Sequence, residues 1–240
     1  MATDIMGFVQ FSDGSFASLL KEGATAETVT SVPTGGNGLN QVSGVEIGQA
    51  YQGKVAVAAN LIVQTDSATT GCFCYGYFLG PDGKIITPVQ GGGHRTTGLP
   101  RLARSVRMQT GVTLQACFDA KADAVALASL AVTCSDGTGD VFFIKAVADT
   151  ATSMVNKDGS SIGQALTGKV LQSCYATYSS TNGLNDDGGG VGAFYIESAE
   201  GSLKFMVPPS NGVGQDPSPW VSGYGVRITQ NDVLYVNAGV

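Results

Sequence analysis

Short runs in which apolar residues alternate with polar or small ones recur along the whole chain. They include KVAVAANLIVQT (54–65), CFCYGYFL (72–79), KVLQSCYATYSS (169–180) and VLYVNA (233–238). Turn-forming stretches such as GPDGK, SDGTG, AEGS and TQND separate these runs. Apolar alternation bounded by Gly, Asp, Asn and Pro predicts short β-strands joined by tight turns. Only FASLLKEGA and DAKADAVALASLA are compatible with helices, and we interpret the second as a linker that leads into a strand.

One nine-residue sequence occurs twice. IGQAYQGKV (47–55) returns as IGQALTGKV (162–170), identical at seven of nine positions. Its neighbours repeat in the same order, since FSDGS (11–15) precedes the first copy and CSDGT (134–138) the second, and changes in spacing fall in loop-like stretches. This order predicts an all-β protein of two tandem, duplicated domains, residues 1–120 and 121–240. With six to eight short strands in each half, we expect small β-sandwiches or barrels.

The composition narrows the class of protein. Charged residues make up only 13% of the chain, glycines number 34 and the net charge is −6, which argues against sequence-independent binding of nucleic acid. Because no apolar stretch is long enough to span a membrane and the first residues lack the features of a signal peptide, we expect synthesis in a cytosol. An odd count of five scattered cysteines then predicts reduced, buried thiols.

Positive charge is concentrated in one segment. Four of the five arginines fall within 13 residues of GGGHRTTGLPRLARSVR (91–107), beside the only histidine. Arginine suits the recognition of carboxylates, so this segment predicts a docking surface for an acidic partner; the alternative is a solvated loop that balances local acid. The matching stretch of the second half, SNGVGQDPSPWVSGYG (210–225), has no cation but carries the only tryptophan. The candidate partner-binding residues are His94, Arg95, Arg101, Arg104, Arg107, Trp220 and Tyr224.

The sequence carries no catalytic signature. NDDGGG (185–190) lacks the alternating oxygen ligands of a calcium loop, and neither GGG run leads into Lys-Ser/Thr as a phosphate loop would. With one histidine and no G-x-S-x-G motif, a Ser-His-Asp site is not expected. We therefore expect no catalytic residues, no cofactor and no metal.

The chain has a terminal strand of the type ITQNDVLYVNAG (228–239), few charges and abundant Gly, Thr, Ser and Asn. In this composition and strand pattern, over its whole length, it resembles tailed-phage virion structural proteins of the β-rich head decoration or cement type. The resemblance implies a non-enzymatic homotrimer that is made in the host cytoplasm and resides in the virion. Its partners would be the major capsid protein or other virion subunits, with no nucleic acid and no membrane. Three duplicated chains would place six similar modules around an axis.

The same strand pattern occurs in two other groups. Tail, baseplate and fibre proteins of phages share it, and so do some carbohydrate-binding β modules. For the second group, an exposed Trp220 beside Tyr224 would supply the aromatic platform on which a sugar stacks. We further expect the segment from His94 to Arg107 to contact an acidic face of a neighbouring subunit. The Trp220 loop would then make a separate, mainly apolar contact.

Overall fold

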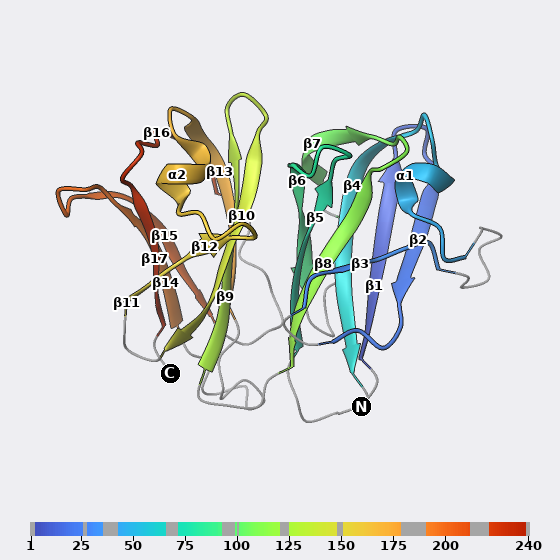
Figure 1. Cartoon of the computed structure of the whole chain (residues 1–240), viewed down its shortest axis with the longest axis horizontal. Coiled ribbons are helices and arrows are strands. Elements are labelled where there is room, and N and C mark those ends of the chain that lie inside the picture. Colours follow the sequence, from blue (N-terminus) through green and yellow to red (C-terminus); the bar gives the residue numbers. More distant parts are fainter. Residues whose placement is uncertain are drawn as a thin grey trace. The chain divides into compact units, whose positions relative to one another are not determined.

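A computed structural model describes ten segments of the chain: residues 3–25, 28–35, 43–65, 72–92, 99, 101–120, 125–147, 151–178, 191–211 and 221–238. The chain divides into two compact units, Met1–Ala120 (unit 1) and Lys121–Val240 (unit 2). Each unit has its own apolar core and is described here by itself (Figure 1).

Unit 1 consists of strands and one short helix. Its elements are β1 (Thr3–Phe11), β2 (Phe16–Lys21), β3 (Thr30–Ser31), α1 (Ile47–Ala50), β4 (Val55–Thr65), β5 (Cys72–Leu79), β6 (Ile85–Gly92), β7 (Arg101–Arg107) and β8 (Thr113–Ala120). The expectation that FASLLKEGA could be helical is wrong, because its first six residues form β2. The exposed Phe16 is followed there by the buried Ala17, Ser18 and Leu19, and the segment pairs with β1 as an antiparallel strand.

Unit 2 repeats this order of elements. They are β9 (Val125–Cys134), β10 (Gly139–Val147), β11 (Ala151–Ser153), β12 (Val155–Asn156), α2 (Ile162–Leu166), β13 (Val170–Tyr178), β14 (Val191–Glu197), β15 (Leu203–Asn211), β16 (Val221–Arg227) and β17 (Val233–Ala238). DAKADAVALASLA therefore leads into a strand, as expected. The all-β class predicted from the alternating pattern is confirmed.

The strand pairings of the two units correspond, with two differences. Unit 2 forms two sheets, in the orders β12-β10-β9-β13-β16 and β11-β17-β14-β15. Unit 1 makes the matching antiparallel pairs, β2-β1-β4-β7 and β3-β8-β5-β6. A bridge between Leu19 and Thr34 takes the place of the β10–β12 pair. Unit 1 adds a short parallel pairing of β4 with β6, residues 60–62 with 90–92, which joins its strands into one eight-stranded sheet.

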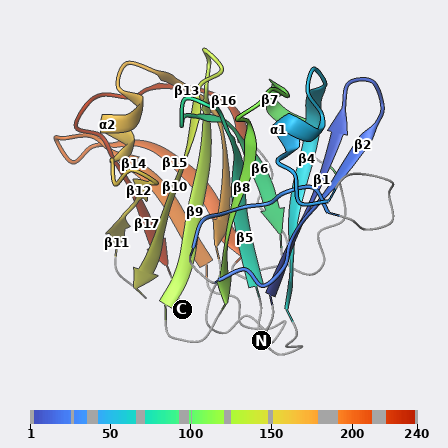
Figure 2. The same ribbon diagram turned by 45° about the vertical axis from the view of Figure 1, so that its right-hand side comes forward.

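Each core lies between the two sets of strands of its unit. In unit 1 the inward face of β1 and β4 supplies Ile5, Val9 and Leu61, and the inward face of β8 supplies Leu114 and Phe118. In unit 2 the same layers supply Leu130, Val132, Phe142, Leu234 and Val236. Both units are thus β-sandwiches with a short helix at one end of the strands (Figures 1 and 2).

Candidate functional site

The repeated nine-residue motif makes the same set of contacts in both units. We call this set of contacts, between the motif and the turn before the last strand, the clasp. Its isoleucine, Ile47 or Ile162, begins the short helix and is fully buried. The glycine that follows has no room for a side chain. A Cβ on Gly48 would lie 2.2 Å from the carbonyl oxygen of Gln109, and one on Gly163 would lie 2.5 Å from that of Gln230. The motif therefore requires glycine where the helix touches the turn before the last strand.

The second half of the motif is equally structural. Gly53 and Gly168 have φ angles of 89° and 77°, a conformation that glycine adopts at little cost. Their amides donate to the carbonyl oxygens of Met108 at 2.9 Å and of Ile228 at 2.9 Å. The final valine, Val55 or Val170, begins β4 or β13. The geometry thus accounts for every glycine of the repeated motif.

The motif lysine ties the clasp to the first hairpin. Lys54 donates to the carboxylate of Asp13 at 2.8 Å, and Lys169 donates to the corresponding Asp136. The lysine, assisted by the hydroxyl and amide of Ser15 or Thr138, holds the pKa of each aspartate well below its usual range. Sequence analysis paired the flanking FSDGS and CSDGT stretches but did not connect them to the motif lysine.

A buried ion pair is found in unit 2. The ammonium group of Lys204 on β15 lies 2.6 Å from the carboxylate of Asp232, whose side chain is fully buried. Lys204 also donates to the carbonyl oxygen of Arg227 at 2.7 Å, and the amide and hydroxyl of Thr229 donate to Asp232. Burial alone would raise the pKa of Asp232, but these hydrogen bonds outweigh it and lower the pKa. Unit 1 has the apolar residues Ile86 and Val112 at the corresponding positions.

A third carboxyl group in unit 2, that of Asp140, has a pKa shifted in the opposite direction. Burial raises the pKa of Asp140, although the amide group of Asn156 donates to it at 2.8 Å and the amide N–H of Val141 donates to it at 2.8 Å. Raised carboxyl pKa values are common where an acid is used in catalysis. Here the hydrogen bond between Asn156 and Asp140 joins the end of β12 to β10, so we assign this carboxyl group a structural role.

Three of the predicted arginines lie together on β7. Arg101, Arg104 and Arg107 are exposed, whereas Val106 between the last two is buried in the core (Figure 2 shows β7 at the same end of unit 1 as α1). In the described residues β7 pairs only with β4, with Arg107 opposite Val55 and Arg101 opposite Ala58. The four residues between Arg101 and Val106 face a single residue of β4, which makes a wide bulge.

The structure describes little of the other four candidate residues. His94, Arg95 and Trp220 lie outside the described residues. Tyr224 belongs to β16, the counterpart of β7, but its side chain is also outside the description. The structure therefore brings Arg101, Arg104 and Arg107 onto one strand, and the side chains of the remaining four candidates lie outside the described residues.

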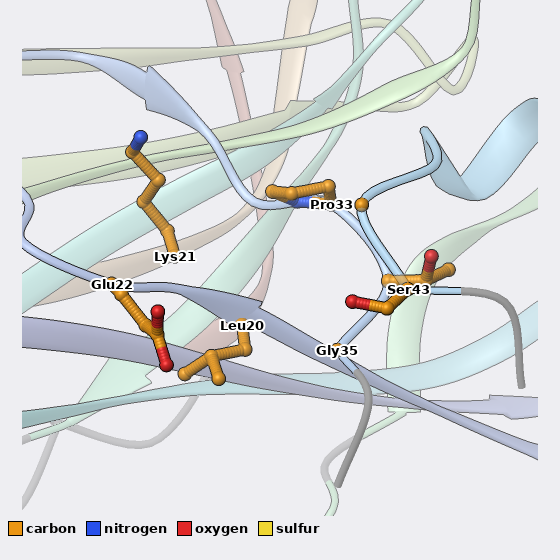
Figure 3. A pocket seen from close by; sticks show the side chains of 8 residues that line it. Leu20, Lys21, Glu22, Pro33, Gly35 and Ser43 are labelled. Atoms are coloured by element: carbon orange, nitrogen blue, oxygen red, sulfur yellow. The ribbon is translucent and has the colours of Figure 1, made fainter.

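A shallow hollow of about 490 Å³ lies beside the end of β2 in unit 1 (Figure 3). It is lined by Leu20, Lys21, Glu22, Pro33, Thr34, Gly35, Ser43 and Gly44. The side chains of Lys21 and Glu22 extend in opposite directions, and no aromatic residue lines the hollow. It therefore offers neither a stacking surface for a sugar nor a set of converging charged groups.

In the described part of the chain, no three His, Cys, Asp or Glu side chains gather closely enough to hold a metal ion. Within the same residues, no helix has the length and apolar character that crossing a membrane requires. Comparison of the chain with protein-family models, curated proteins and solved structures gives no match.

Proposed function

We propose that the protein is a non-enzymatic structural component of a virus particle, a decoration or cement protein on the head of a tailed phage. One observation carries the proposal. The most specific signal in the sequence, the repeated IGQA…GKV motif, makes the same internal contacts in each of the two sandwiches, with its glycines in close contacts and its lysine in an ion pair. The chain thus contains two similar domains, and a capsid lattice is likewise built from repeated copies of similar units.

The arrangement of strands supports a role of this kind. In each unit the chain passes repeatedly from one set of strands to the other, and only β1–β2 and β5–β6, or their counterparts, are hairpins within one set. This wrapping is that of jelly-roll sandwiches, which build viral capsid and lectin domains. One fold can serve many functions, so the strand order is compatible with the proposed function but also with others.

The surface and the symmetry are consistent with assembly. Charged residues are 13% of the chain, so little charge must lose its water when copies pack together. Three copies of a two-unit chain would surround a three-fold axis with six similar units, which matches a six-fold position of a capsid lattice. The proposed partners are therefore the major capsid protein and two further copies of this chain.

Co-sedimentation tests the proposal. Heads of the phage that encodes the chain, prepared without this protein, are mixed with the purified chain and pelleted. We expect saturable binding at a fixed number of chains per capsid subunit, with the protein alone and fully decorated heads as controls. Binding to tails or baseplates instead would favour the other virion components. Retention on a glycan column without binding to heads would favour a carbohydrate-binding module.

A further inference from the structure

The β7 edge carries two arginines, Arg101 and Arg107, that form no ion pair with a described residue. Both residues are exposed. The ion pairs between described residues use lysines instead, at Lys54, Lys157, Lys169 and Lys204. Arginine is less strongly hydrated than lysine and binds carboxylates through two parallel hydrogen bonds, so it suits contacts that become buried.

The two units differ in charge. Residues 1–120 contain eight carboxylates and seven lysines or arginines, whereas residues 121–240 contain eleven carboxylates and six lysines or arginines. Their formal charges are therefore −1 and −5, which together give the −6 of the whole chain. The arginine-bearing edge thus belongs to the nearly neutral unit, and the larger excess of carboxylates belongs to the other.

The same edge of unit 2 supplies an internal comparison. Arg107 lies opposite Val55, and Arg227 lies opposite the corresponding Val170. At the other end of the strand the two edges differ, because Arg101 faces Ala58 whereas Ser222 faces Ser173. The first edge therefore has its extra cations within the bulge and at its start, where the second has serine, glycine and tyrosine.

We propose that the arginines of β7 bind the acidic second unit of another copy of this chain. The contact is head to tail, since unit 1 of one copy meets unit 2 of the next, and such contacts close into a ring when the rotation between copies permits. The number of copies in the ring, three, is taken from the proposed function. In such a ring, unit 1 and unit 2 alternate around the axis. The proposed contact holds this ring together.

Glu200 is the acidic residue that best suits the role of acceptor. It lies at the tip of the β14–β15 turn, is exposed, and forms no ion pair with a described residue. Among the described residues of unit 2, the other exposed carboxylates each have a lysine neighbour, since Asp136 has Lys169 and Asp158 has Lys157. A free carboxylate on a protruding turn can reach a bulged edge strand without distorting either unit.

The test is sedimentation velocity of the isolated full-length chain over a range of concentration and salt. The variant Arg101→Glu with Arg107→Glu reverses the charge of the edge. Arg227→Glu is the matched control for the change at Arg107, because it makes the same substitution at the corresponding strand position of unit 2. Circular dichroism and thermal unfolding verify that each variant is folded. A third protein adds Glu200→Lys to the double variant to restore the opposite charges.

We expect the wild-type chain to form oligomers whose dissociation constant rises with salt. The double variant should dissociate at least about tenfold more readily, Arg227→Glu should stay within about twofold of wild type, and Glu200→Lys should restore part of the loss. Equal self-association of wild type and double variant would overturn the proposal, as would a wild-type chain that stays monomeric. Aggregation of the double variant would also overturn it, because the arginines would then only protect an exposed edge.

The outcome is separable from that of the proposed function. A double variant that still forms wild-type oligomers but no longer pellets with phage heads would show that β7 faces the capsid. That result would contradict the self-contact and leave the structural role intact. A double variant that is monomeric at concentrations where wild type is oligomeric supports the self-contact whether or not heads bind.

Discussion

The amide of Gly163 donates a hydrogen bond to the carbonyl oxygen of Asp232 at 3.0 Å, and this contact leaves no space for a side chain on the glycine. A Cβ at that position would lie 2.6 Å from the same carbonyl oxygen. Gly48 makes the corresponding bond to Val112 at 3.1 Å in unit 1. The contact joins the short helix to the turn before the last strand in both sandwiches.

Gly163→Ala and Gly48→Ala should therefore each destabilise their unit. Because backbone atoms of the turn must move, the expected loss is about 1–3 kcal/mol, the usual cost of forcing an extra methyl group into a packed site. Urea unfolding followed by fluorescence and circular dichroism measures it. Gln49→Ala, at an exposed position of the same helix, is the control and should change stability by less than about 0.5 kcal/mol. Glycine variants that unfold like wild type would contradict the clasp.

Removing one partner of the Lys204–Asp232 pair should be costly. Asp232→Ala leaves the ammonium group without its carboxylate, and we expect a loss of about 3 kcal/mol, because Lys204 keeps only 23% of its side chain exposed. The double variant Lys204→Ile with Asp232→Val introduces the residues of the corresponding positions in unit 1. It should recover most of the loss, since apolar pairs of similar size replace buried ion pairs at little cost. A double variant as unstable as Asp232→Ala would refute this account.

Stability should fall in acid partly through Asp232. Its pKa in the folded protein lies below 3.8, the ordinary value, so its contribution is fully present above 3.8 and is lost as the pH falls through the folded pKa. Asp140 acts in the opposite direction, because its folded pKa is raised and protonation there favours the fold. Urea midpoints between pH 7 and about pH 3 should thus fall less in Lys204→Ile with Asp232→Val than in wild type. Equal loss of stability in acid by the two proteins would exclude Asp232 as a cause of the acid sensitivity.

The thiols should be reduced and slow to react. Cys117, Cys134 and Cys174 form no disulfide and are buried, and burial raises the pKa of the Cys174 thiol to about 12 and raises that of Cys134. A thiol reagent added to native protein at pH 8 should modify these three only as the protein opens. In denaturant without reductant, all five cysteines of the chain should react. Finding four of the five paired would contradict the expectation.

The alternating pattern predicted the all-β class because strands with one buried face show it directly, as the buried Ile5, Val9 and Phe11 of β1 do. Sequence identity separately identified the repeated motif, but neither signal predicted the helices α1 and α2. Those helices have four and five residues, too few for a helical period to be visible in a sequence. Their role became clear only from the contact of Gly48 and Gly163 with a distant turn.

The candidate binding site stays a prediction. Arg101, Arg104 and Arg107 are close together in the sequence, and the structure places them on one strand with their side chains exposed. The Lys204–Asp232 pair was missed, because its partners are 28 residues apart and meet only across the sheet that contains β14. Long-range pairs of this kind depend on strand register, which no local pattern reveals.

Cryo-electron microscopy of reconstituted phage heads tests the central claim most directly. Heads that lack the protein are incubated with an excess of the purified chain and imaged beside untreated heads. We expect added density at repeated lattice positions, with two similar sandwich-shaped lobes for each bound chain and six lobes around each three-fold axis. Treated heads whose surface is indistinguishable from that of untreated heads would contradict the proposed role.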